Sequence, residues 1–166
     1  MPIPEQLKAI QNRTPLASRT AGTPVADLAR AAIRAILAKK GSGISVMDMR
    51  QVSGVADYFV ICTGTSDVQI RALATEIQEV IRKEYGERPW HVEGLESLRW
   101  VLIDYVDLVV HVMIADAREF YGLERLWGDA PVENVADEAT EPELAILSSR
   151  RKEVNQNPVA GTGKTG

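Results

Sequence analysis

The feature that most constrains the fold is a very short connection between two apolar segments. "LRWVLIDY" and "DLVVHVMI" are both rich in Val, Ile and Leu, and only Val106 separates the first from the second. Branched and aromatic residues favour strands, and a connection this short joins antiparallel neighbours. The sequence therefore predicts an antiparallel strand pair between residues 98 and 114.

Helical and strand patterns alternate before this pair. Apolar residues recur at helical spacing over 25–37, after Thr23-Pro24, and predict an amphipathic helix. The segments "ISVMDMRQV", "DYFVICTG" and "PWHVEG" predict three further strands. A long helix separates the last two; Ser66 with Gln69 predicts its capping box and Gly86 its end.

A last helix follows the strand pair. Asp116 with Glu119 predicts a second capping box, and the spacing of Phe120, Leu123 and Trp127 predicts the inner face. The whole order predicts an α/β fold, with a mixed sheet of about five strands flanked by helices. The strand–helix–strand step from "DYFVICTG" to "WHVEG" predicts an adjacent parallel pair with a right-handed crossover.

The chain of 166 residues is long enough for one domain with tails. Residues 1–23 are polar and contain three prolines, which predicts a flexible N-terminal arm. We expect the domain to occupy 24–128. Residues 129–166 are acidic and rich in small side chains, so we expect a largely disordered tail with a marginal helix over "EPELAILSSRRKEV".

Charge and cysteine content restrict the partners and the compartment. The net charge of −4 gives no global basic field to hold DNA. The longest apolar run, 108–115, is too short to span a membrane, and no secretory signal is present at the N-terminus. The single cysteine, Cys62, favours a reducing compartment and lies in an apolar strand, where a buried, inert thiol is expected. We expect a cytoplasmic protein.

The acidic residues do not have the spacing of a metal-dependent transferase. Such enzymes hold magnesium with carboxylates two residues apart on a strand, because those side chains share a face. Asp104 and Asp107 are three apart and flank a turn. The one pair with that spacing, Glu141 and Glu143, lies in the expected tail. We expect no enzyme activity, metal site or cofactor, and a nucleotidyltransferase-like enzyme is the alternative.

Histidines do not change this expectation. His91 and His111 are the only two, and Cys62 lies in a separate strand, whereas zinc sites need three or four ligands. His111 sits within an apolar strand. A histidine hydrogen-bonded within the fold explains it better than a ligand or a general base.

Trp100 has two interpretations. Val101 and Ile103 share one face of their strand, and Trp100, Leu102 and Asp104 share the other. In one interpretation Trp100 belongs to the core. In the other, Trp100 and Leu102 form an exposed apolar patch with Tyr105, rimmed by Asp104 and Asp107, as at protein interfaces. The pattern alone does not decide between them.

Several motifs together resemble one protein family, and this resemblance favours the interface interpretation of Trp100. "DYFVICTGTSDVQIRALA", "HVEG", "WVLIDYVDLVVHVM" and "REFYGLERLW" resemble the ribosomal silencing factor family (RsfS), also called the Iojap-like proteins. The resemblance covers about 24–128. One position departs from the family pattern, since Val106 stands where the family usually has glycine, and a β-branched residue resists positive φ.

The resemblance implies a nucleotidyltransferase-like fold without catalytic acids and a role that is not enzymatic. It implies binding to the large ribosomal subunit through its ribosomal protein fourteen, where the bound domain sterically blocks the small subunit and represses translation when nutrients are scarce. Organellar members imply an alternative role in large-subunit assembly. A homodimer formed through the same patch is a further expectation for the free protein.

The resemblance also implies the contact residues. These are Trp100, Asp104 and Tyr105, with Tyr121 on the adjoining helix as a weaker candidate; the apolar patch adds Leu102 and Asp107. We expect Trp100 to be an exposed anchor, because Val101 and Ile103 already supply the inward face of the strand.

Overall fold

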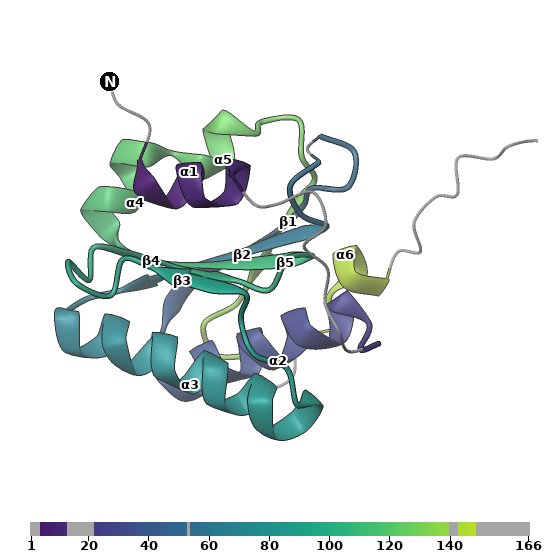
Figure 1. Ribbon diagram of the computed structural model, residues 1–166, viewed down its shortest axis with the longest axis horizontal. Coiled ribbons are helices and arrows are strands. Elements are labelled where there is room, and N and C mark those ends of the chain that lie inside the picture. Colours follow the sequence, from purple (N-terminus) through teal and green to yellow (C-terminus); the bar gives the residue numbers. More distant parts are fainter. Residues whose placement is uncertain (1–3, 13–21, 53, 140–142, 149–166) are drawn as a thin grey trace, which may run out of the picture.

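A six-stranded mixed sheet with helices on both faces forms the centre of the protein (Figure 1). The computed structural model describes residues 4–12, 22–52, 54–139 and 143–148. The strand order is β3-β4-β5-β2-β1-β6. The strands are β1 (Ser42–Asp48), β2 (Tyr58–Gly64), β3 (His91–Glu93), β4 (Trp100–Asp104), β5 (Leu108–Ile114) and β6 (Val132–Val135). The predicted mixed α/β fold is confirmed, with one strand more than expected.

The centre of the sheet is built around the β4–β5 pair. These strands are antiparallel, as predicted, and β5 runs parallel to β2. The predicted pairing of β2 with β3 is wrong, because β5 and β4 lie between them. β4 and β5 are almost wholly buried, whereas all three residues of β3 are partly exposed, so the more apolar strands take the centre and β3 forms an edge.

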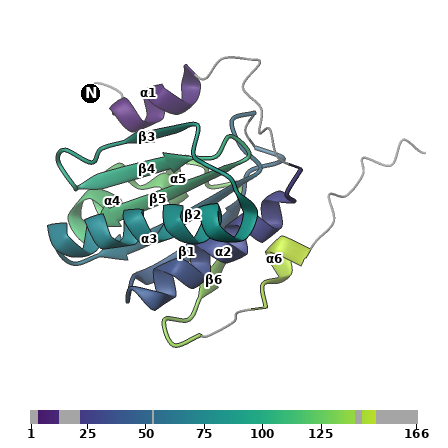
Figure 2. The ribbon, with the colours of Figure 1, turned by 60° about the horizontal axis from the view of Figure 1, so that its bottom comes forward.

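Two long helices cover one face of the sheet, α2 (Val25–Ala38) and α3 (Asp67–Tyr85). On the other face lie α4 (Ala115–Tyr121) and α5 (Leu123–Leu126), with the short helix α1 (Glu5–Gln11) across the β3–β4 end (Figures 1 and 2). β4 is therefore buried on both sides: Val101 packs in the cluster with α2 and α3, and Trp100 in the opposite cluster.

The start of α3 follows the predicted cap. The Ser66 hydroxyl accepts a hydrogen bond from the backbone N–H of Gln69 at 3.1 Å. The Gln69 amide also accepts from the Thr65 N–H and donates to the carbonyls of Lys39 and Lys40. One side chain thus joins the start of α3 to the end of α2. Gly86 ends α3 with a φ of 69°, as predicted.

The predicted details of the last helix are wrong in two respects. α4 begins at Ala115 without a side-chain cap, so Asp116 and Glu119 form no capping box. Phe120, expected inside, is 61% exposed. Gly122 takes a left-handed conformation with a φ of 54°, which breaks the helix and changes which side chains of 115–126 face the sheet; Leu123 is buried as expected.

The fold extends beyond the expected limits of 24–128. β6 pairs with β1, and the four-residue helix α6 (Ala145–Ser148) packs near α2 within the segment expected to be largely disordered. Val135 and Leu147 are buried in the α2–α3 cluster, which explains why these pieces dock. In the expected arm, α1 docks through Ile10. The remaining parts of the arm and tail, 1–3, 13–21, 140–142 and 149–166, lie outside the described residues.

Candidate functional site

Trp100 lies inside the protein and does not form an exposed anchor. Its side chain is 2% exposed, and its indole N–H donates to Nδ1 of His111 at 3.1 Å. The ring centroid lies 4.9 Å from that of Tyr121. Leu102, which pairs with His111 across the strands, is fully buried as well. The expected exposure of both residues is wrong, because α1 and α4 cover the face that the sequence analysis left open.

His111 is held in the neutral form by its surroundings. Its ring is fully buried between Phe59, whose centroid lies 4.7 Å away, and Trp100. Burial lowers the pKa of His111 to about 3. Because Nδ1 accepts the Trp100 hydrogen bond, the proton belongs on Nε2, which has no hydrogen-bond partner among the described residues. The prediction of a histidine hydrogen-bonded within the fold is confirmed.

Asp104 shapes the turn between β4 and β5. Its carboxylate is fully buried and accepts a hydrogen bond from the backbone N–H of Val106 at 2.7 Å. Val106 takes a φ of 71°, the left-handed conformation that glycine would adopt without strain. The valine therefore keeps the turn geometry typical of glycine, and the hydrogen bond to the Asp104 carboxylate stabilises it. The expected exposure of Asp104 is wrong.

Asp107 and Tyr105 lie at the same turn but do not form a patch with Trp100. Asp107 is partly exposed, and its carbonyl accepts from the backbone N–H groups of Asp57 and Tyr58. Tyr105 is 1% exposed and packs in the α2–α3 cluster, on the other side of the sheet from Trp100. Burial raises the pKa of its hydroxyl, which has no hydrogen-bond partner among the described residues. Its expected exposure is wrong.

The candidate residues therefore divide into two groups. Trp100, Leu102 and Tyr121 meet on the face covered by α1 and α4. Asp104 lies four residues beyond Trp100 along β4, which is roughly 13 Å at strand spacing, and Tyr105 and Asp107 lie in the turn that follows. Within the first group only Tyr121 reaches the surface, with 39% of its area exposed.

An exposed aromatic pair, Phe120 and Tyr121, is the surface feature that the sequence analysis missed in part. The two rings lie edge to face with centroids 5.0 Å apart. Tyr121 rests on Trp100, so the buried indole supports the exposed pair from below. Gly122 was the available signal, because a glycine directly after the pair ends the helical repeat that placed Phe120 inside.

Arg118 fixes the helix that carries this pair. Its guanidinium donates to the hydroxyls of Thr63 at 2.9 Å and Ser45 at 3.0 Å, on β2 and β1. It also forms an ion pair with Glu124, at 2.7 Å, on α5. One side chain thus joins α4 to two strands and to the next helix. Phe120 and Tyr121 are presented from a rigid base.

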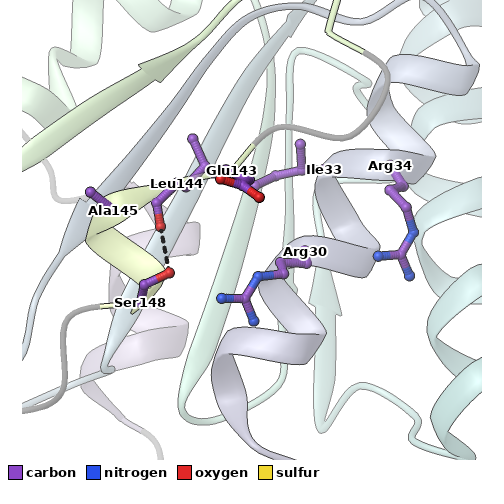
Figure 3. Close-up of a pocket in the computed structure, with 7 residues that line it drawn as sticks. All are labelled: Arg30, Ile33, Arg34, Glu143, Leu144, Ala145 and Ser148. Atoms are coloured by element: carbon purple, nitrogen blue, oxygen red, sulfur yellow. Dashed lines mark hydrogen bonds between the residues drawn. The ribbon is translucent and has the colours of Figure 1, made fainter.

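A cavity of roughly 660 Å³ between α2 and α6 is a second candidate (Figure 3). Arg30 and Arg34, from α2, and Glu143, which precedes α6, are among the residues that line it (Figure 3). Arg30 pairs with Asp27, and Arg34 pairs with Glu84. Both guanidinium groups are thus already partly neutralised, and a carboxylate lines the same space. The cavity is therefore poorly suited to bind an anion.

Reactive and metal-binding groups are not assembled in the part of the chain that the structure describes. Cys62 is fully buried, as expected, and burial raises the pKa of its thiol to about 12, which keeps it protonated. Among the described residues, no three His, Cys, Asp or Glu side chains gather to hold a metal ion. Over the same residues, no helix is both long and apolar enough to cross a membrane.

These features define a small mixed α/β domain whose sheet is covered on both faces and which displays an aromatic pair on a short helix. A family model described as "Ribosomal silencing factor during starvation" matches residues 23–160. The chain belongs to this ribosomal silencing factor family. The recognition made from the motifs is confirmed.

Individual relatives agree with this assignment. A ribosomal silencing factor RsfS of Halalkalibacterium halodurans is 44% identical over 105 residues, which cover 63% of this chain and 89% of the relative. The RsfS of Bacillus subtilis is 48% identical, over 57% of this chain and 79% of the relative. A crystal structure of a Chromobacterium violaceum protein superposes with a TM-score of 0.62 at 34% identity, covering 64% of this chain and 88% of that one.

A more distant relative carries a different description. It is the mouse protein named "Mitochondrial assembly of ribosomal large subunit protein 1", 33% identical over 43% of this chain and 32% of its own length. The chain is thus similar both to proteins named for silencing and to a protein named for assembly.

Proposed function

We propose that this protein is a cytoplasmic ribosomal silencing factor that acts by binding and not by catalysis. It docks on the large ribosomal subunit through ribosomal protein fourteen, blocks joining of the small subunit, and represses translation under nutrient limitation. Membership of the family supports this proposal most directly. The names of the bacterial relatives support the silencing role over the alternative of large-subunit assembly, which the name of the mouse relative suggests.

We place the partner contact on the aromatic pair Phe120 and Tyr121. Exposed aromatic side chains on a rigid support are favoured anchors of protein interfaces, because they bury large areas at little entropic cost. Phe120 is 61% and Tyr121 39% exposed, and Arg118 and Trp100 hold them from beneath. The remaining motif residues have positioning roles in this proposal. Trp100 and Leu102 support Tyr121, while Asp104, Tyr105 and Asp107 set the β4–β5 turn.

Blocking requires only a rigid body at the right place. The sheet is sealed by helices on both sides, so the domain resists deformation when a second subunit approaches. The net charge of −4 favours a protein contact over ribosomal RNA as the source of affinity. The same aromatic pair offers a contact for a homodimer when no ribosome is present.

Sedimentation tests the proposal directly. The purified protein is mixed with isolated small subunits, isolated large subunits and whole ribosomes. We expect it to sediment with large subunits only and to slow subunit joining followed by light scattering. Sedimentation with small subunits, or binding to large subunits that leaves joining unchanged, would refute the silencing role; the second result would favour assembly.

The enzymatic alternative has its own test. A nucleotidyltransferase would bind a nucleoside triphosphate with magnesium. We expect calorimetry of the purified protein with each nucleotide and magnesium to show no saturable heat. A saturable site lost in an Asp104→Asn or an Asp107→Asn variant would favour the enzyme.

A further inference from the structure

Helix α1 lies on the face of the sheet that carries the proposed docking site. It crosses the β3–β4 end on the same side as α4 and α5 (Figures 1 and 2). Gln6 donates a hydrogen bond from its side-chain amide to the backbone carbonyl of Trp100 at 2.8 Å. Ile10 is 3% exposed and belongs to the cluster that contains Trp100 and Leu102. Trp100 is therefore in contact with α1 through its backbone and with Tyr121 through its ring.

Gln6 takes the place of a missing strand residue. β3 pairs with β4 only from His91 to Glu93, opposite Asp104 to Leu102, so the Trp100 carbonyl lies just beyond the end of β3. Gly94 passes so close to this carbonyl that a side chain there would collide with it. The chain turns away from β4 at Gly94. The side-chain amide of Gln6, on α1, therefore donates to the Trp100 carbonyl in place of a backbone N–H from β3.

The attachment of α1 is small. The helix has seven residues and no side-chain cap; Ile10 is its one fully buried residue, and Leu7 packs beside the same cluster while partly exposed. Helices of this length are unstable alone in water, so α1 keeps its form only while it is docked. It also precedes residues 23–160, the part of the chain that the family model matches.

We propose that α1 is an intramolecular cover that competes with the ribosomal partner for the face around Trp100. This inference rests on the proposed function and adds a form of regulation to it. When α1 leaves, the part of the Trp100–Leu102 cluster that contains Ile10 opens to solvent next to the aromatic pair. The docking surface then grows from two side chains to a continuous apolar face. A cover that is closed 90–99% of the time would lower the apparent affinity by about 10–100-fold.

The test uses two matched variants of the full chain. Ile10→Asp puts a charge on the buried side of α1, and Gln11→Asp puts the same charge on the exposed neighbouring position. Both are made with Trp90→Phe and Trp127→Phe, so that Trp100 is the only fluorescent tryptophan. Gln6→Ala is a milder third variant that removes only the hydrogen bond to Trp100.

Two measurements follow for each variant. We expect acrylamide to quench Trp100 several-fold more strongly in Ile10→Asp than in the parent or in Gln11→Asp. We expect the affinity of Ile10→Asp for isolated large subunits to rise by at least about tenfold, and that of Gln6→Ala to rise by less. Quenching that does not change, or an affinity of Ile10→Asp that equals or falls below that of Gln11→Asp, would overturn the proposal.

These outcomes separate the cover from the proposed function. If quenching rises and Ile10→Asp binds more tightly than the parent, both proposals are supported. If quenching rises but no variant sediments with large subunits, the proposed function has failed and competition with the ribosome is rejected with it. If the parent binds and Ile10→Asp binds more weakly, the ribosome function survives, and α1 is part of the binding surface and not a cover.

Discussion

The buried carboxylate of Asp104 holds the backbone N–H of Val106 at 2.7 Å, while Val106 takes a φ of 71°. A β-branched residue in the left-handed region costs about 1–2 kcal/mol. The hydrogen bond from the Val106 N–H to Asp104 offsets part of this strain energy. Losing the bond would leave the N–H of the nearly buried Val106 without this acceptor, which costs further free energy. The two residues therefore act as a unit that fixes the β4–β5 turn.

Removing this carboxylate should destabilise the fold. We expect Asp104→Ala to lower the free energy of unfolding by about 1–3 kcal/mol, because a buried N–H loses its acceptor. Asp104→Asn keeps an acceptor oxygen and should cost less than about 1 kcal/mol. Urea denaturation of the three proteins measures the difference. In a Val106→Gly background the cost of Asp104→Ala should be smaller, since glycine adopts the conformation unaided; equal costs in both backgrounds would contradict the coupling.

Truncating Trp100 should harm stability before it harms binding. Because the side chain is 2% exposed and bonded to His111, we expect Trp100→Ala to cost about 3–5 kcal/mol of folding free energy. Trp90, at 46% exposure, is the matched control, and Trp90→Ala should cost less than about 1 kcal/mol. Thermal melts and urea denaturation provide the comparison. A Trp100→Ala protein as stable as its parent would show that the indole is not part of the core.

The stability of the protein should fall in mild acid through His111. The pKa of the buried imidazole is lowered to about 3, whereas a histidine in the unfolded chain titrates near 6.5. Between these values the unfolded chain binds the extra proton, so the free energy of unfolding decreases as the pH falls from about 6.5 toward 3, by at most about 1.4 kcal/mol per pH unit. Carboxylates titrate in the same window, so the comparison is with His111→Phe. That variant should lose part of the slope between pH 4 and 6; an unchanged slope would contradict a neutral buried histidine.

Truncating the aromatic pair should weaken binding more than it destabilises the fold. We expect Tyr121→Ala and Phe120→Ala each to weaken binding to isolated large subunits by about tenfold or more, because an aromatic anchor of an interface contributes about 1.4 kcal/mol or more. Their melting temperatures should change little for Phe120→Ala and moderately for Tyr121→Ala, which contacts Trp100. Val68→Ala is the control: Val68 is 80% exposed and belongs to α3, on the other face of the sheet. Equal affinities for all three variants would show that α4 does not make the partner contact.

The sequence pattern was sufficient for the elements whose signals are local. The apolar runs of β2, β4 and β5, the Ser66 cap and the Gly86 stop are each determined by neighbouring residues, and all were predicted. Strand adjacency is not local. β3 was expected beside β2, but the pairing depends on which strands bury most on both faces, and that is known only when all strands are compared.

The exposure predicted for the candidate residues was wrong for a related reason. Alternation within β4 separates Val101 from Trp100 correctly, but it does not tell whether the second face is covered. Here α4 and α1, which lie more than one hundred residues apart in the sequence, cover it. The exposure of Phe120 depends in turn on the helix break at Gly122. Contacts between distant segments decided each of these outcomes.

The two edges of the sheet are both very short. β3 has three residues and carries Glu93, which contacts His91, and β6 has four residues and carries Glu133, which accepts a hydrogen bond from the N–H of Ile146. Short edges with carboxylates are poor templates for strand addition, because few backbone groups are open and an incoming strand meets charge. The two edges of the described sheet therefore disfavour the addition of a strand from a second molecule.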